Sequence, residues 1–109
     1  MFNVIGIRSN YKNKQMKIPK QIKIGNLIYK ITFSDDITVN SCGRSGLVKQ
    51  RIILNSEMSN DLQYETFLHE IIHQILDSKS FKQESADEKL VDVLATGFYQ
   101  VLKDNKIIN

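Results

Sequence analysis

The period of the apolar residues changes once along this chain, near Ser59, and this change constrains the fold more than any other feature. Before Ser59, apolar and polar residues alternate, as they do in strands with one buried face. After Ser59, apolar residues recur about every 3.6 positions, as they do in amphipathic helices. Strands followed by helices predict an α+β domain, with two main helices packed on one face of a small sheet.

Two pairs of strands are predicted before Ser59. The stretch KQIKIGNLIYKITF alternates on both sides of Gly25 and Asn26, a dipeptide that favours the positive φ angles of a tight hairpin turn. A second pair is predicted for VNSCGRSGLV and RIILN, where glycines loosen the first arm. We therefore expect an antiparallel-rich sheet of three to five strands.

Two helices are predicted after the strands. The first runs from Ser59 to Asp77 and is followed by a polar loop. Ser85 and Glu88 then form an S-x-x-E capping box, which predicts a second helix that continues to about Asp104. Because the linker is short, the two helices should be neighbours.

The apolar residues of the first helix predict which of its faces meets the sheet. At roughly 100° per residue, one broad arc is apolar and consists of Leu68, Ile71, Ile72, Ile75 and Leu76. The other side gathers Thr66, His69, Glu70 and His73. We expect the apolar arc to be buried against the sheet.

The composition is that of one folded domain, because 109 residues with 41% hydrophobic content suffice for a single core. We expect this domain to span residues 1–109, with residues 1–15 as an N-terminal extension. No stretch approaches the roughly 20 apolar residues of a membrane span, and the first residues show no signal-peptide pattern. A single cysteine, Cys42, makes no internal disulfide, so we expect a cytoplasmic protein.

The net charge of +3 hides a division along the chain. Residues 1–34 carry seven basic side chains and no acid, whereas the remaining residues have a net charge of −4. Such asymmetry occurs in proteins that contact nucleic acid, but lysines that alternate with apolar residues are more typical of the solvated face of a sheet. Nucleic acid is therefore the less favoured partner.

The stretch FLHEIIHQIL holds both histidines of the chain. On a helix, His69 and His73 lie one turn apart, so their imidazoles project side by side and can bind one metal ion. Glu70, about 100° further round, can lie beside the ion and act as a base. Two histidines, a third protein ligand and an open position for water are what a hydrolytic Zn²⁺ centre requires. The simpler interpretation is an exposed histidine pair with no function.

The second helix supplies candidates for the third ligand. Glu88 and Asp92 lie one turn apart at the margin of its apolar arc, where an unpaired carboxylate is costly to bury. We expect Glu88 to bind the metal and Asp92 to be an outer-shell acceptor that fixes a histidine tautomer. The capping box also explains Glu88, so Glu84 and Asp87 remain alternative ligands. Cys42 is interpreted as a small residue at a bend rather than a ligand.

These residues resemble the zincin metallopeptidases, through the H-E-x-x-H pattern within TFLHEIIHQI. The later E-x-x-x-D of Glu88 and Asp92 resembles the gluzincin branch, in which a glutamate on a following helix is the third zinc ligand. In size, and in the ending LATGFYQVLKDN, the chain is similar to the minigluzincins and to small metallopeptidases of bacteria and phages. The likeness covers about residues 16–105.

The resemblance implies a zinc-dependent peptidase in which Glu70 is the general base and a peptide or protein is the substrate. The substrate is expected to lie extended along an edge strand within residues 40–55. Larger gluzincins use a histidine or tyrosine of a further domain to stabilise the oxyanion, and this chain has no counterpart of that domain. Tyr64 and Arg51 are candidates for this role, Tyr99 is expected to pack instead, and the metal alone is the alternative.

A second hypothesis comes from a different class of protein. It is a non-catalytic interaction module, zinc-stabilised or metal-free, whose basic N-terminal sheet binds nucleic acid or a protein partner. Glu70 favours the enzyme, because a carboxylate that is not needed to hold the metal points to chemistry.

Overall fold

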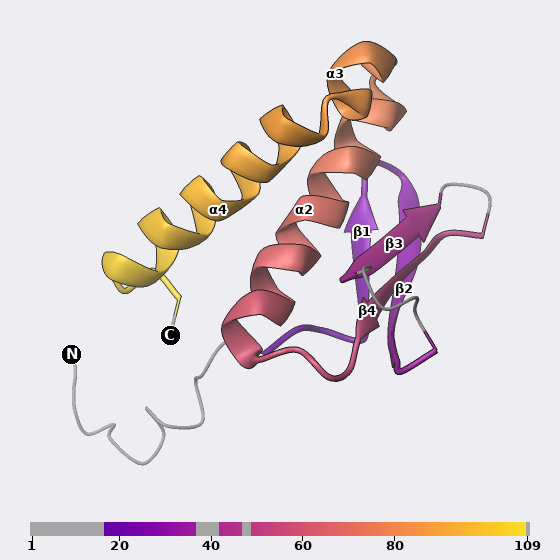
Figure 1. Cartoon of the computed structure of the whole chain (residues 1–109). Helices are drawn as coiled ribbons and strands as arrows, with labels where there is room; N and C mark the ends of the chain where they lie inside the picture. Colours follow the sequence, from indigo (N-terminus) through magenta and orange to yellow (C-terminus); the bar gives the residue numbers. More distant parts are fainter. Residues whose placement is uncertain (1–16, 37–41, 47–48, 109) are drawn as a thin grey trace.

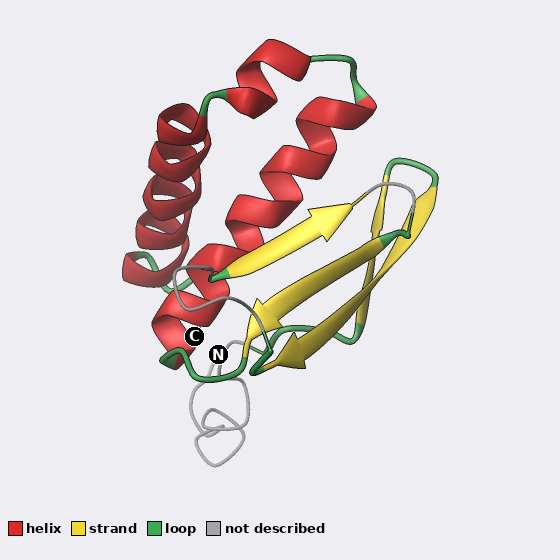
Figure 2. Cartoon of the chain, turned by 45° about the vertical axis from the view of Figure 1, so that its right-hand side comes forward, coloured by secondary structure: helices red, strands yellow, loops and turns green. Residues whose placement is uncertain are grey.

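The computed structural model describes residues 17–36, 42–46 and 49–108, so the expected extension at residues 1–15 lies outside the described residues. A sheet forms one side of the molecule and the helices form the other (Figures 1 and 2), which confirms the α+β prediction. The described elements follow the order β1 (Gln21–Ile24), β2 (Leu27–Ser34), β3 (Gly43–Gly46), β4 (Arg51–Asn55), α2 (Asn60–Ser78), α3 (Lys82–Ala86) and α4 (Glu88–Asp104).

Both predicted strand pairs are present and antiparallel. β1 and β2 form a hairpin whose turn contains Gly25 at φ 60°, a conformation that favours glycine. β3 and β4 pair in the same way, with Gly43 opposite Leu54 and Gly46 opposite Arg51. The sheet is nevertheless mixed, because β2 and β4 run parallel and the strand order is β1-β2-β4-β3. This order places β3 at an edge of the sheet.

The core lies between the sheet and α2. Its fully buried side chains on the central strands are Tyr29, Ile52 and Leu54, and Phe67 of α2 packs against them. α2 begins close to the predicted start at Ser59, which caps the helix, since its side-chain oxygen accepts a hydrogen bond from the backbone N–H of Leu62.

The prediction of which face of α2 packs against the sheet is wrong. The buried residues of this helix are Thr66, Phe67, Glu70 and Gln74. Of the predicted apolar arc, Ile71 packs against the core, whereas Ile75 is 42% exposed. The physical reason is that the facing edge of the sheet, β3, carries glycine and serine, which admit short and polar side chains and offer a hydrogen-bond partner.

The second helical region also differs from the prediction at its start. The expected polar loop contains the short helix α3, and the residue that caps α4 is Asp87, whose carboxylate accepts a hydrogen bond from the N–H of Leu90. Ser85 is buried within α3 and does not form the predicted capping box. The end of α4 at Asp104 agrees with the prediction.

The helix α4 forms an outer layer on the same side of the sheet as α2. It packs on α2 through Val91, Ala95 and Tyr99, and among the described elements it contacts α2 and α3 but no strand (Figures 1 and 2). At the far end of the helix pair, Asp61 of α2 accepts hydrogen bonds from the hydroxyl of Tyr99 and, at 2.6 Å, from Nζ of Lys103. Within the described residues, no helix has the length and apolarity needed to cross a membrane.

Candidate metal centre

The two histidines of α2 converge on one point. Because His69 and His73 are one helical turn apart, their rings lie edge to face with centroids 4.8 Å apart, and their Nε2 atoms are 3.2 Å apart. Two unprotonated ring nitrogens this close repel each other, so a proton or a cation between them is required. The arrangement therefore suits a shared ion.

Glu88, the first residue of α4, completes the set. Its Oε1 atom lies 3.0 Å from Nε2 of His69 and 3.2 Å from Nε2 of His73. These three side chains are also the group of potential ligands found among the described residues. Ligand atoms around a tetrahedral Zn²⁺ are roughly 3.3 to 3.5 Å apart, so the observed triangle fits such an ion to within a few tenths of an ångström.

Ser85 holds His73 from the opposite edge of its ring. The Oγ atom of Ser85 lies 3.0 Å from Nδ1 of His73 and donates a hydrogen bond to the carbonyl oxygen of the same residue, at 3.4 Å. Because a hydroxyl has one hydrogen, Oγ then accepts from Nδ1–H, which leaves the Nε2 lone pair directed towards Glu88. This is the tautomer that a metal ligand needs.

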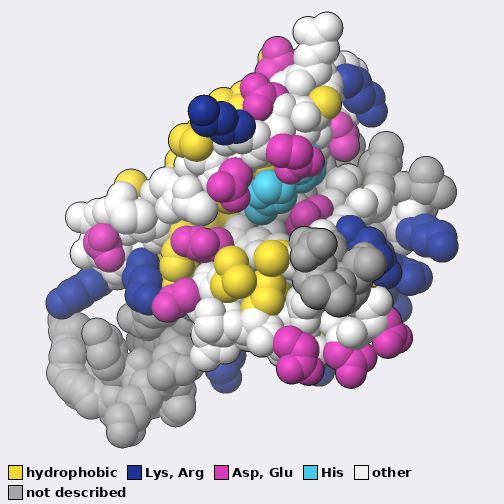
Figure 3. Space-filling model, in the orientation of Figure 1, with side chains coloured by type: hydrophobic (Ala, Val, Ile, Leu, Met, Phe, Trp, Pro, Cys, Tyr) yellow, Lys and Arg dark blue, Asp and Glu magenta, His cyan; other side chains and the backbone are white. Residues whose placement is uncertain are grey.

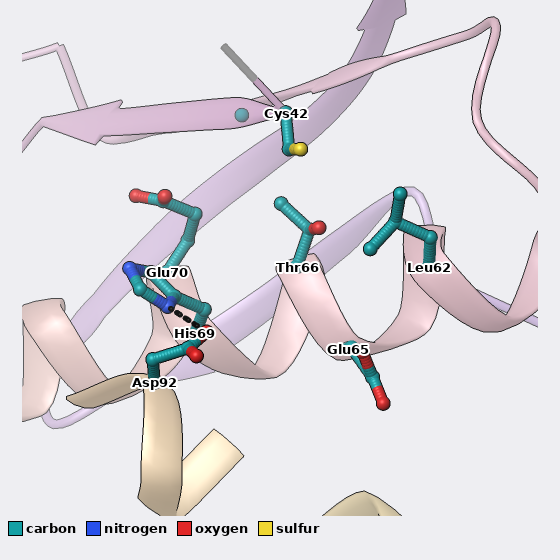
Figure 4. A pocket seen from close by; sticks show the side chains of 8 residues that line it. Cys42, Leu62, Glu65, Thr66, His69, Glu70 and Asp92 are labelled. Atoms are coloured by element: carbon teal, nitrogen blue, oxygen red, sulfur yellow. Dashed lines mark ion pairs between the residues drawn. The ribbon is translucent and has the colours of Figure 1, made fainter. Parts of the chain in front are cut away.

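Asp92 approaches the other histidine. Its Oδ1 atom lies 3.7 Å from Nδ1 of His69 (Figure 4), which is close enough for an ionic contact and longer than a direct hydrogen bond. The predicted pair of α4 carboxylates thus meets His69 at its two ring nitrogens, with Glu88 at Nε2 and Asp92 at Nδ1.

Glu70 does not belong to the group formed by His69, His73 and Glu88. Its carboxylate is directed towards the strand that follows Cys42 (Figure 4) and accepts a hydrogen bond of 2.6 Å from Oγ of Ser45 on β3. The side chain is buried, with 7% of its surface exposed.

A groove between β3 and α2 gives access to these residues. It consists of two adjoining cavities of about 280 and 370 Å³, which share Gly43, His69 and Glu70 in their walls. Glu65 and Asp92 line the first cavity, and Asp77 and Glu88 line the second. Figure 3 shows the histidines surrounded by acidic side chains on this face. The site is open to solvent, and its acidic side chains outnumber Arg44, the one lysine or arginine among the described residues of its walls, which favours a cation over an anion.

The remaining candidates from the sequence lie elsewhere or have other roles. Glu84 and Asp87 are exposed and are not in the group with the two histidines, and Asp87 caps α4. Cys42 is exposed and lines the first cavity without joining that group. Arg51 lies on the open face of the sheet, because the adjacent Ile52 points into the core.

Tyr64, a candidate for the oxyanion role, and Tyr99, which was expected to pack, contact each other at the far end of the helices. Tyr64 stacks on Tyr99 with ring centroids 5.5 Å apart, and burial raises the pKa of Tyr64. Burial, followed by the hydrogen bond to Asp61, raises the pKa of Tyr99 to about 12. Tyr99 thus packs between the helices, as expected from its distance along α4 from Glu88.

Comparison with known proteins adds no family to this description. No protein-family model matches the chain, and searches of curated proteins and of solved structures find no match either. The interpretation of the site therefore rests on its own residues and geometry.

The sequence patterns did not assign three residues, Ser45, Gln74 and Ser85, to the site. Ser85 was assigned to a helix cap, and neither Ser45 nor Gln74 was singled out. Their positions depend on how β3 and α3 pack on α2, which is a tertiary property. The available signal was weak: Gln74 is a polar residue next to His73 in an otherwise apolar stretch.

Proposed function

We propose that this protein is a zinc-dependent metallopeptidase of the gluzincin type. The observation that carries the proposal is the triangle formed by His69 Nε2, His73 Nε2 and Glu88 Oε1, with sides of 3.0 to 3.2 Å. Two neutral histidines and one carboxylate form a common ligand set of catalytic zinc, in which a fourth position stays open for water. The resemblance to the zincins gives the same assignment from the sequence.

The chemistry divides between the metal and the side chains of this chain. A bound Zn²⁺ would lower the pKa of a coordinated water and polarise the peptide carbonyl. Glu70 is the residue that would accept the proton of that water and pass it to the leaving amine. Ser85 keeps Nδ1 of His73 protonated, and Asp92 orients His69 from its Nδ1 side.

The groove beside β3 is the place where we expect the substrate. β3 is an edge strand, and an extended peptide can add to such an edge through main-chain hydrogen bonds. Because the wall of the groove carries Glu65, Asp77 and Asp92, we expect cationic peptides to be accepted more readily than acidic ones. We also place the reaction in the cytoplasm, on the basis of the single cysteine.

The test combines metal analysis with cleavage. Protein purified without chelator should contain about one zinc per chain and should cleave labelled lysine-rich peptides, with cleavage lost on addition of a chelator. Glu70→Gln should retain zinc and lose cleavage, whereas Glu57→Gln, at an exposed carboxylate that lines neither cavity of the groove, should retain both. A protein that holds zinc and yet cleaves no peptide would contradict the enzyme and leave a zinc-stabilised module.

A second candidate function is supported by the open face of the sheet. Lys23, Lys30, Arg44 and Arg51 are exposed there, and the described strands carry no carboxylate. This is the surface that the interaction-module hypothesis requires for nucleic acid. Duplex DNA binding with a steep dependence on salt, reduced by Lys30→Glu, would favour it. The absence of such binding would leave these residues as a solvated face.

A further inference from the structure

A chain of hydrogen bonds runs through the protein interior and ends at Glu70. The hydroxyl of Tyr29 donates to Oε1 of Gln74 at 3.1 Å, and Nε2 of Gln74 donates to Oγ of Ser45 at 2.8 Å. Ser45 then donates to Oε1 of Glu70 at 2.6 Å. The chain joins β2, α2 and β3.

The direction of this chain is fixed by the chemistry of its members. A tyrosine hydroxyl that donates to the amide oxygen of Gln74 turns the amide N–H₂ towards Ser45. Since Oγ of Ser45 accepts from that amide, its single hydrogen is free to donate to Glu70. The chain therefore delivers a donor to the carboxylate, and donors in series polarise one another.

Burial makes the chain rigid. Tyr29 is 1% exposed, Gln74 is 3% exposed and Glu70 is 7% exposed. Leaving a polar group this buried without its partner raises the free energy of the folded protein, so each member restricts the orientation of the next. Ser45 is the partly buried member that touches the carboxylate.

Glu70 needs such restriction because of its neighbours. It follows His69 directly in the sequence, and a carboxylate is itself a common zinc ligand. If Glu70 turned towards the ligand atoms, its carboxylate would become an additional ligand of the metal and would no longer be free to accept the proton of the bound water. The hydrogen bond from Ser45 instead holds it towards β3 (Figure 4).

We propose that Ser45, supported by Gln74 and Tyr29, is a positioning residue that keeps Glu70 available as a base and prevents it from becoming a metal ligand. This inference rests on the proposed function, since it requires a metal at His69, His73 and Glu88. It goes beyond the H-E-x-x-H pattern, because Tyr29 and Ser45 lie on strands and Gln74 is the residue after the last histidine of the pattern.

The decisive measurement is the visible absorption of the Co²⁺-loaded protein, which reports coordination number without requiring a substrate. Tetrahedral four-coordinate Co²⁺ absorbs more strongly than five-coordinate Co²⁺, because its d orbitals mix more extensively with p orbitals. Ser45→Ala releases Glu70, which can then bind the ion as a fifth ligand. The visible absorbance of the Co²⁺-loaded variant should therefore be roughly two-fold lower than that of the wild type. Adding Glu70→Ala to Ser45→Ala should restore the wild-type spectrum. Two control variants should leave the spectrum unchanged. Ser45→Thr keeps the hydroxyl, and Ser56→Ala changes an exposed serine that takes no part in these hydrogen bonds.

Cleavage of labelled lysine-rich peptides by the zinc-loaded protein gives a second readout. Ser45→Ala should lower kcat about 10-fold to 100-fold with little change in KM and no loss of zinc, since a carboxylate that leaves its position no longer serves as base. Ser45→Thr should recover most of the loss.

The outcomes separate this inference from the function on which it rests. Wild-type protein that binds no Co²⁺ would contradict both. Co²⁺ bound with the same spectrum in wild type and Ser45→Ala would overturn the role of Ser45 and leave the metal centre standing. A spectral change that persists in the double variant with Glu70→Ala would also overturn it, because Ser45 would then act on the metal by another route.

Discussion

The Oγ atom of Ser85 lies 3.0 Å from Nδ1 of His73, on the edge of the imidazole opposite the nitrogen that faces Glu88. A residue of the short helix α3 thus determines which nitrogen of an α2 histidine is free to bind an ion. Partners of this kind fix both the tautomer and the ring orientation of metal-binding histidines. The role explains why a serine is buried in a five-residue helix of otherwise exposed residues.

Replacement of this serine should weaken metal binding. We expect Ser85→Ala to lower the affinity for Zn²⁺ about 10-fold to 100-fold, because His73 loses the acceptor that holds its Nδ1–H. Competition with a fluorescent zinc chelator measures the affinity. Ser78→Ala removes an exposed hydroxyl at the end of α2 and should leave the affinity unchanged. Equal affinities in the two variants would show that Ser85 only packs.

The third ligand can be identified by a pair of glutamate variants. Glu88→Ala should reduce zinc affinity by more than about 100-fold, beyond the effect of an outer-shell residue, because it removes an atom 3.0 Å and 3.2 Å from the two Nε2 atoms. Glu84→Ala removes an exposed carboxylate of α3 and should retain the metal. Zinc lost from the Glu84 variant and kept by the Glu88 variant would move the ligand to α3.

The contact between β3 and α2 depends on the absence of a side chain at Gly43. A Cβ atom there would lie 2.8 Å from Cγ2 of Thr66 and 3.0 Å from the carbonyl oxygen of Ile53. We expect Gly43→Ala to lower the free energy of unfolding by about 1 to 3 kcal/mol, as overpacking does. Gly46→Ala, in the same strand with open space around it, is the control and should change stability by less. Urea denaturation followed by circular dichroism compares the two.

The protein should lose stability at alkaline pH because of Tyr99, which lies between α2 and α4. The pKa of Tyr99 is raised to about 12 in the folded protein, mainly by burial and then by its hydrogen bond to Asp61. A group whose pKa rises on folding stabilises the fold below its unfolded pKa, here about 10, and that stabilisation is lost as the pH rises towards the folded value. The free energy of unfolding should therefore fall by about 2 kcal/mol between pH 10 and 12 on account of Tyr99.

Tyr99→Phe separates this contribution from others. It should be less stable than wild type at pH 8, because it lacks the hydrogen bond to Asp61, and should lose less stability between pH 10 and 12. A residual decline is expected from Tyr29 and Tyr64, whose pKa values are also raised by burial. Parallel curves for wild type and variant would contradict the assignment. Chemical denaturation at several pH values is the measurement.

The features predictable from sequence were those set by local pattern. The alternation around Gly25 gave the first hairpin, and the helical spacing after Ser59 gave α2 and the length of α4. The one-turn spacing of His69 and His73 required their rings to be adjacent wherever the helix packed. The proximity of Glu88 followed from a short linker, although that linker contains α3.

The features that were missed depend on packing between distant segments. The alternation in β2 and β4 is the same for parallel and antiparallel pairing, so it does not predict their parallel register. The inward face of α2 was misassigned because burial of Glu70 and Gln74 depends on Ser45, a residue of a different strand that supplies their hydrogen bonds. Apolar periodicity does not register such partners.

Glu88 lies on α4, the outer layer of the fold, so it can join the two histidines of α2 only after α4 has formed. α4 rests on α2 and α3 and touches none of the described strands, so the sheet and α2 can close their shared interior before α4 has been synthesised. Both histidines would then stand on a finished helix while the carboxylate of Glu88, 15 residues beyond His73, is still absent. On our proposal, a nascent chain binds its ion only weakly, and therefore has little activity towards neighbouring polypeptides, until α4 has docked.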